Sequence, residues 1–214
     1  MTGQRGEATP PEGVRRGVGG RVTVPVTLSP EEAARDLAPR LRALAKEATR
    51  ASSTSPDPDA DGKTDAETDA ELRVPVVTID GYSGSGKSTL AAALERHLEG
   101  WQVLHLDDWY PGWDGLAEGA RVARAIAHDL RAGRPSSYVT WDWEASGPGH
   151  TVRVPLAPTI IEGCGALEAD ADLSVWIADP GEEERRSRAI ARDGQTYEPH
   201  WRRWAAQDMG RSVK

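Results

Sequence analysis

The spacing of apolar and polar residues predicts alternating strands and helices from Val74 onward. Short runs rich in Val, Ile and Leu, bounded by turn residues, predict buried strands. These strand candidates are residues 74–80, 101–107, 157–163 and 173–179. Apolar residues recurring at the helical period predict helices. These helix candidates are residues 88–100, 115–133, 180–194 and 197–210. Because strands that alternate with helices form βαβ units, we expect an α/β fold with a mostly parallel sheet covered by helices on both faces.

The N-terminal third of the chain has a different pattern. Residues 1–20 are rich in Gly, Pro and Arg, and residues 52–71 hold seven acidic residues and one lysine without any large apolar side chain. Such stretches cannot bury enough apolar surface to offset the entropy of ordering, so we expect both to be unstructured. Between them the sequence predicts an extended piece over residues 22–28 and a helix over residues 30–48, with Ser29 as its N-cap.

These patterns divide the chain into an N-terminal extension, residues 1–73, and an α/β region, residues 74–214. The extension is expected to be partly helical, partly disordered and dispensable, so that a chain starting near Leu72 still folds. Within the α/β region, residues 137–143 and 151–157 are predicted to be short extended segments on either side of a Gly/Pro-containing turn.

Composition narrows the class of protein. The formal charge is −8 and the pI about 5.2, which argues against a general nucleic-acid coat protein or a membrane-surface binder. The apolar runs are far shorter than the ~20 residues that span a bilayer. The N-terminus has no apolar segment of the kind found in secretory signals, and the single cysteine, Cys164, excludes an intrachain disulfide. We therefore expect a cytoplasmic protein without nucleic-acid or membrane partners; its oligomeric state is not predicted.

Residues 81–88, GYSGSGKS, match the phosphate-binding pattern G-x-x-x-x-G-K-[ST] between a predicted strand and a predicted helix. Phosphates need several N–H donors that converge on one point, and a loop of small residues permits this. The residues predicted to bind the nucleotide are Gly81, Ser83, Gly84, Ser85, Gly86, Lys87, Ser88 and Thr89. In this pattern Lys87 contacts the β- and γ-phosphates and the hydroxyl of Ser88 binds Mg²⁺. The loop predicts that the protein binds a nucleoside triphosphate.

Several classes of P-loop protein lack support in the sequence. The N/T-K-x-D motif of guanine-specific GTPases and the LSGGQ-like signature of ABC ATPases are absent. The strand at residues 159–163 ends in Glu-Gly, whereas mechanical ATPases have Asp-Glu after four apolar residues. The small phosphotransferases remain.

Asp107 and Asp108 follow the second predicted strand of the α/β region. Ligands of parallel α/β sheets bind beyond the carboxyl ends of the strands. A carboxylate there can face the γ-phosphate and accept a proton from an attacking hydroxyl. An Asp-Asp pair can also cap a helix or form a turn, and the sequence does not decide which of the two would be the base.

Four segments in order, GYSGSGKSTLA, LDDWY, WDW and IIEG, resemble the uridine kinase/phosphoribulokinase-like group of P-loop kinases. The resemblance extends from Val74 to Asp208. The first motif is specific, and the other three are short and depend on their order and spacing. Trp109 replaces the usual Phe, and the segment between Trp143 and Val154 is short for a nucleobase-holding hairpin. The resemblance therefore implies the reaction type and leaves the acceptor open.

Carried over to this sequence, the resemblance implies that Asp107 is the general base and that Tyr110 and Asp142 bind the acceptor. It implies that Glu162 helps to place Mg²⁺. Arg188 and Arg192, four residues apart on a predicted helix, resemble the arginines of a mobile lid that stabilise the transferring phosphoryl group. A solvated, charged helix face is the alternative for this pair.

The aromatic residues near these motifs have two interpretations. Trp109, Trp113, Trp141 and Trp143 could form a flat platform for a ring-shaped acceptor. The chain has no Phe, so these tryptophans could instead fill core positions.

Together the motifs predict an ATP- and Mg²⁺-dependent kinase that phosphorylates a hydroxyl of a small metabolite, for which a nucleoside is a candidate. The competing hypothesis is a nucleotide switch or ATPase that uses no small-molecule acceptor. A kinase-like protein that binds ATP without transferring phosphate is a third alternative, against which the intact loop and Asp107 weigh.

Overall fold

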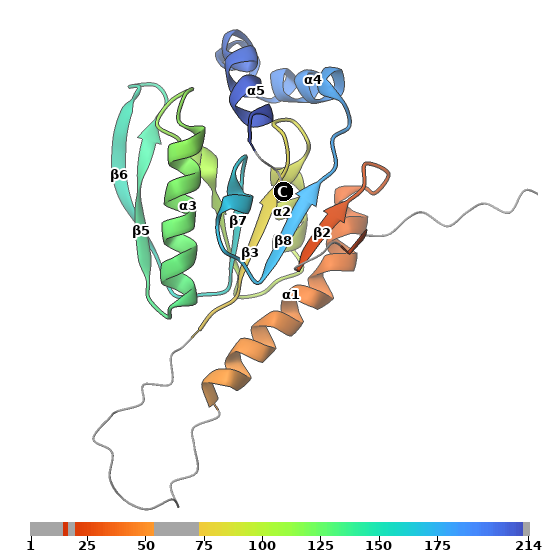
Figure 1. The fold of residues 1–214 in the computed structure, drawn as a ribbon, viewed down its shortest axis with the longest axis vertical. Helices are drawn as coiled ribbons and strands as arrows, with labels where there is room; N and C mark the ends of the chain where they lie inside the picture. Colours follow the sequence, from red (N-terminus) through yellow and green to blue (C-terminus); the bar gives the residue numbers. More distant parts are fainter. Residues whose placement is uncertain (1–14, 17–19, 54–72, 212–214) are drawn as a thin grey trace, which may run out of the picture.

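The computed structural model describes residues 15–16, 20–53 and 73–211. Its main sheet has six strands in the order β1-β2-β8-β3-β7-β4 (Figure 1). The strands are β1 (Arg15–Arg16), β2 (Arg21–Val24), β3 (Val76–Asp80), β4 (Gln102–His105), β7 (Thr159–Glu162) and β8 (Leu173–Ile177). All neighbouring pairs are parallel except β1 with β2. The predicted α/β class with a mostly parallel sheet is confirmed.

Helices cover both faces of this sheet, as predicted. They are α1 (Pro30–Ser53), α2 (Lys87–Glu95), α3 (Leu116–Arg131), α4 (Glu182–Asp193) and α5 (Trp201–Met209). One core cluster joins α1 and α2 to the sheet through residues such as Leu37, Leu94 and Val175. A second cluster joins α3 and α5 to the opposite face through residues such as Ile126, Trp204 and Ile161. In Figure 1, α4 and α5 lie beyond the carboxyl ends of the strands.

The N-terminal segment belongs to the same sheet-and-helix unit. β2 pairs in parallel with β8 over the registers Arg21↔Ser174 to Val24↔Ile177, and α1 packs against α2. The side chains of Val22 and Leu37 are fully buried in the resulting core. The expected division at residue 73 therefore does not separate two units of this fold. The expectation that the extension is dispensable conflicts with this burial.

The predicted N-terminal helix is present and continues further than expected, to Ser53. Ser29 and Glu32 form a reciprocal capping pair, in which each backbone N–H donates to the other residue's side-chain oxygen at 2.9 and 3.3 Å. The predicted disordered stretch, residues 52–71, lies outside the described residues from residue 54 on, and most of residues 1–20 do as well.

The two extended segments predicted around residues 137–157 form a separate antiparallel hairpin. Its strands are β5 (Ser136–Asp142) and β6 (Gly147–Val154), and it lies beside α3 (Figure 1). Short 3-10 turns follow β4 (Leu106–Asp108) and β7 (Ala166–Glu168), and two more connect α4 to α5 (Gly194–Thr196 and Glu198–His200).

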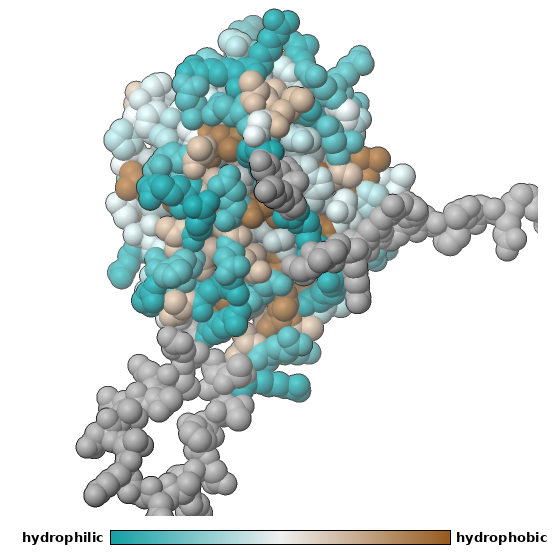
Figure 2. Space-filling model, viewed as in Figure 1, coloured by the Kyte–Doolittle hydropathy of each residue, from teal (hydrophilic) through white to brown (hydrophobic). Residues whose placement is uncertain are grey.

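The surface in Figure 2 is mostly hydrophilic, with small scattered apolar areas. Of the helices that the structure describes, none has the length and apolar character that crossing a membrane requires.

Candidate active site

The phosphate loop connects β3 to α2. Gly84 and Gly86 have φ angles of +80° and +103°, which side chains other than glycine rarely adopt. A Cβ atom on Gly84 would lie 2.1 Å from the carbonyl oxygen of Arg185. Glycine is therefore required at position 84 for two reasons, backbone conformation and close approach of α4. α2 begins at Lys87, so the loop ends at a helix N-terminus that favours anions.

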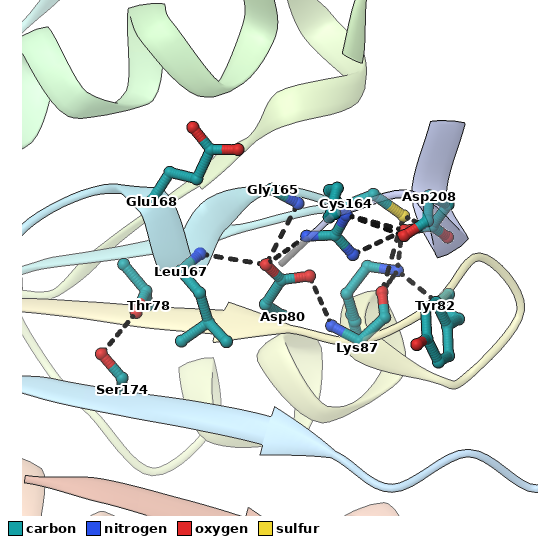
Figure 3. Close-up of polar contacts among 12 residues, drawn as sticks. Thr78, Asp80, Tyr82, Lys87, Cys164, Gly165, Leu167, Glu168, Ser174 and Asp208 are labelled. Carbon is teal, nitrogen blue, oxygen red and sulfur yellow. Dashed lines mark hydrogen bonds and ion pairs between the residues drawn. The ribbon is translucent and has the colours of Figure 1, made fainter. Parts of the chain in front are cut away.

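Lys87 is buried at the centre of this region (Figure 3). Its Nζ donates to the carbonyl oxygens of Gly81 at 2.9 Å and Tyr82 at 3.2 Å, and to the Sγ of Cys164 at 3.3 Å. Burial by itself lowers the pKa of Lys87, but the negative groups around it, including Asp208 and Glu162, raise the pKa above its ordinary value. Lys87 is therefore a cation at neutral pH.

A cavity of about 570 Å³ opens in front of Lys87. It is bounded by the phosphate loop, the ends of β4 and β7, and the C-terminal segment, residues 182–211. The predicted site residues that line it are Ser83, Gly84, Lys87, Ser88, Asp107, Tyr110, Glu162 and Arg192. Residues from three neighbouring parallel strands thus converge at one edge of the sheet, as α/β topology favours.

Glu162 is buried at the end of β7, where His105 holds its carboxylate. His105 Nδ1 and Glu162 Oε1 are 2.6 Å apart. Burial raises the pKa of Glu162, but the hydrogen bond from His105 and the charge of Lys87 outweigh it and lower the pKa. The same hydrogen bond raises the pKa of His105. Ser88 and Glu162 both line the cavity, so two oxygen ligands of the kind Mg²⁺ prefers face the same space.

The structure separates the two neighbouring aspartates. Both side chains are exposed, but Asp107 lines the cavity, whereas Asp108 lies 3.4 Å from the hydroxyl of Tyr138 in the hairpin. Surrounding protein atoms partly desolvate Asp107, and this, together with the negative charge of Glu162, raises the pKa of its carboxyl. Of the two, only Asp107 faces Lys87 and Glu162 across the cavity.

The two arginines of α4 lie in different places. Arg192 lines the cavity, with its guanidinium bonded to Asp193. Arg188 instead pairs with Glu184 at 2.8 Å and lines a second cavity. The structure therefore places the predicted pair against different cavities, although residues four apart lie on one face of a helix.

The two residues predicted to bind the acceptor occupy structural positions. The hydroxyl of Tyr110 donates to the carbonyl of Cys164 at 2.7 Å, and its ring packs on Trp204, so it forms a wall of the cavity. Asp142 does not line the cavity. Its Oδ1 accepts the N–H groups of Glu144 and Ala145, which closes the turn after β5. The structure does not support acceptor contact for Asp142.

The four tryptophans divide between the two interpretations. Trp113 and Trp143 line the cavity, with ring centroids 4.7 Å apart. Trp109 is buried, and its Nε1 donates to the carbonyl of Gly119, so it is a core residue. Trp141 lies along another groove, outside the cavity.

Several residues of the C-terminal segment complete the cavity, and no sequence motif predicted them. These residues are Asp193, Thr196, Tyr197 and Trp204. Trp204 also belongs to the core cluster that joins α3 and α5 to the sheet. The aromatic richness of residues 197–204 was the available signal, but no motif linked it to the phosphate loop.

A second cavity, of about 440 Å³, adjoins the same loop. Loop residues Ser85, Gly86 and Thr89 line it, whereas Ser83 and Gly84 line the first cavity. Its other walls are the connection between β2 and α1, residues 24–30, and the segment after β8. The N-terminal segment therefore forms part of the surroundings of the phosphate loop.

Comparisons with known proteins give matches of limited extent. No family model matches the chain. Cytidylate kinase from Shewanella sp. (strain MR-4) is 62% identical over 58 residues, which are 27% of this chain and 21% of that protein. Cytidylate kinase from Shewanella sp. (strain W3-18-1) is 43% identical over 58 residues, with the same coverage. The chain thus matches about a fifth of the length of these curated relatives.

Among solved structures, the chain is similar to a "Possible Uridine Kinase from Bacillus stearothermophilus". The sequence identity is 18% and the TM-score 0.41, with 83% of this chain and 98% of that chain covered.

Proposed function

We propose that the protein is an ATP- and Mg²⁺-dependent phosphotransferase that moves the γ-phosphate of ATP to a hydroxyl of a small metabolite. The observation that supports this most directly is the convergence of Lys87, Asp107 and Glu162 on one cavity. A cation, a base and a metal-binding carboxylate are the groups that phosphoryl transfer requires. The partial identity with cytidylate kinases agrees with a kinase and leaves the acceptor open.

The two cavities beside the loop support a specific arrangement of ATP. The triphosphate lies along residues 81–89, with the γ-phosphate toward Lys87. The adenosine end lies in the second cavity, where Val24, Val26 and Leu28 offer apolar contact and Arg188 a planar cation. Val26 lines this cavity and is 57% exposed, so its side chain is available to a ligand.

Ser88 and Glu162 would hold Mg²⁺, since both line the cavity and a small hard cation prefers oxygen ligands of this kind. Bound there, Mg²⁺ neutralises charge on the phosphates. His105 keeps Glu162 in place through its 2.6 Å hydrogen bond.

In the transfer step, Asp107 takes the proton of the acceptor hydroxyl as its oxygen attacks the γ-phosphorus. The bond between the γ-phosphorus and the β–γ bridging oxygen breaks, and ADP leaves with the electron pair. Lys87 and Arg192 stabilise the negative charge on the transferring group. Aromatic side chains, including Trp113 and Trp143, bound the space for the acceptor.

A switch protein without an acceptor would need no such space. The cavity of about 570 Å³ on the Asp107 side of the loop favours a transferase over the switch. Its size is in the ordinary range for a small-molecule site.

The experiment is a calorimetric titration with ATP and millimolar Mg²⁺, followed by a screen of nucleosides, sugars and vitamins for acceptor-dependent ADP release. Phosphorylation of one acceptor class supports the proposal. ATP hydrolysis that no acceptor stimulates would favour the switch, and absence of binding by any triphosphate would refute both.

The position proposed for the adenosine end of ATP has its own test. Arg188→Ala and Val26→Ala should weaken ATP binding several-fold and leave the affinity for inorganic tripolyphosphate unchanged. Equal losses for both ligands would contradict the assignment of the second cavity to adenosine.

A further inference from the structure

Residues of the C-terminal segment form hydrogen bonds with three atoms of Ser83, a residue of the phosphate loop. The backbone N–H of Ser83 donates to Asp208 Oδ2 at 2.7 Å, and the hydroxyl of Tyr197 donates to its Oγ at 2.8 Å. Arg185 Nη1 donates to its carbonyl oxygen at 3.3 Å. These partners follow Ser83 by more than a hundred residues, so the contacts are tertiary.

Asp208 belongs to a buried charge network that also holds the start of the loop (Figure 3). Arg211 pairs with Asp208 at 2.5 Å and with Asp80 at 2.7 Å. Asp80, at the end of β3, accepts the N–H groups of Gly81, at 2.6 Å, and Gly165, at 3.1 Å. Arg211 therefore joins the carboxylate at the start of the loop to the carboxylate that holds its middle.

The network is buried and largely neutralised. The side chain of Asp80 is inaccessible to solvent, and those of Asp208 and Arg211 are 1% and 9% exposed. Isolated buried charges are costly, and such groups are retained where partners satisfy them. Here Arg211 pairs with the carboxylates of both Asp80 and Asp208, whose charges also act on Lys87.

Ser83 does not contribute its N–H to the cavity, since Asp208 accepts it. The N–H of Ser85 donates to the carbonyl of Tyr82 at 3.0 Å, so phosphate would rely on the other N–H groups of the loop, whose direction depends on where Ser83 is held. A loop fixed before binding loses less conformational freedom when phosphate arrives, which raises affinity.

We infer that Asp208 and Arg211 are positioning residues that hold the phosphate loop in its phosphate-binding shape through Ser83 and Asp80. This inference rests on the proposed function for its effect on ATP, and on the geometry alone for its effect on the loop. It assigns to the last turn of the described chain a role in nucleotide affinity that no motif of that segment predicts.

The loop itself supplies the first test. Amide hydrogen exchange of the peptide covering residues 79–90 should be about tenfold faster or more in Asp208→Ala than in the wild type, because a charge-assisted hydrogen bond to Ser83 is lost. Asp208→Asn, whose amide oxygen can still accept, should restore part of the protection. Arg202→Gln, an exposed change on the same helix, is the matched control and should exchange like the wild type.

The second readout is ATP affinity. Arg211→Lys should raise the Kd and KM for ATP several-fold, with the KM for the acceptor unchanged. Tyr197→Phe keeps the ring in the cavity wall and removes the hydroxyl that bonds Ser83, so it should raise the Kd for ATP several-fold. If Asp208→Ala does not fold, loop hydrogen exchange and ATP affinity are measured on these two milder variants instead.

Unchanged loop exchange in the folded variants would overturn the inference. If the wild type binds no triphosphate, the proposed function fails, while the exchange measurement still shows whether the C-terminal segment holds the loop. Faster exchange with unchanged ATP affinity would reject the role in binding.

Discussion

The indole N–H of Trp143 donates a 3.0 Å hydrogen bond to the main-chain carbonyl of Asp107. This bond ties the turn of the β5–β6 hairpin to the residue whose carboxylate faces Lys87 across the cavity. The hairpin, which lies outside the main sheet, thereby helps to fix the position of Asp107, the residue proposed as the general base.

Trp143→Phe keeps an aromatic wall and removes this hydrogen bond. We expect kcat for acceptor phosphorylation to fall about tenfold, because a small displacement of a base costs much of its effect. ATP affinity should stay at the wild-type value. Trp141→Phe, outside the cavity, is the control, and an equal loss in both variants would contradict the role of the bond.

Asp107→Asn should bind ATP normally and lose phosphoryl transfer by about 10²–10⁴-fold, the usual contribution of a general base. Asp108→Asn is the matched control and should stay within a few-fold of the wild type, since Asp108 lies outside the cavity. Steady-state kinetics with calorimetry checks both. Normal transfer by Asp107→Asn would remove the base assignment.

The raised pKa of Asp107 predicts the form of the pH dependence. The base must be unprotonated, so the transfer rate should fall with decreasing pH through a pKa above the ordinary 3.8 of an aspartate. The raised pKa also affects stability. Because the folded state favours the protonated carboxyl, ionisation of Asp107 lowers the stability of the folded state as the pH rises.

Asp107→Asn should therefore raise the Tm relative to the wild type at pH 7, with a difference that shrinks toward pH 4. Thermal melts at several pH values measure it. A Tm difference independent of pH would show that the Asp107 carboxyl is not perturbed.

Lys87→Ala should reduce turnover by about 10²–10³-fold or more, since a buried cation aimed at the phosphates is lost. It should also lower stability, because the carboxylates of Asp208 and Glu162 would then lack their central counter-charge. Lys46→Ala, on the exposed face of α1, removes the same charge without either effect. ADP release and thermal melts distinguish the two variants.

A chain starting at Leu72 should fail to fold stably, because it lacks β2 and α1 and exposes the core face on which they pack. Leu37→Ala tests the same contact more gently and should cost about 2–5 kcal/mol. Asp36→Ala, exposed on the same helix, should change stability by no more than about 0.5 kcal/mol. Urea unfolding of the three proteins would show an independent N-terminal extension if all were equally stable.

Local patterns predicted most of the fold. The strands at residues 76–80 and 159–162 and the glycine-rich loop have signals within a few consecutive residues, and the structure has them as expected. The loop and the strand ends also placed Lys87, Asp107 and Glu162 in one cavity, since parallel topology fixes where strand ends meet.

The remaining features depend on contacts between distant residues. β2 is four residues long and acquires its place from pairing with β8, which no local pattern records. The sequence does not record which groups hold the side chain of Asp142. In the structure its Oδ1 accepts the N–H groups of Glu144 and Ala145. Arg188 and Arg192 share a helix, but neighbouring elements decide which cavity each one lines.

The parallel pairing of β2 with β8 joins segments about 150 residues apart. On the ribosome, β2 therefore cannot pair with β8 until residues 173–177 have been made. Until then the apolar side chains of Val22, Val24 and α1 lack their native cover. Contacts between such distant segments slow folding, so we expect the pairing of β2 with β8 to form late in folding.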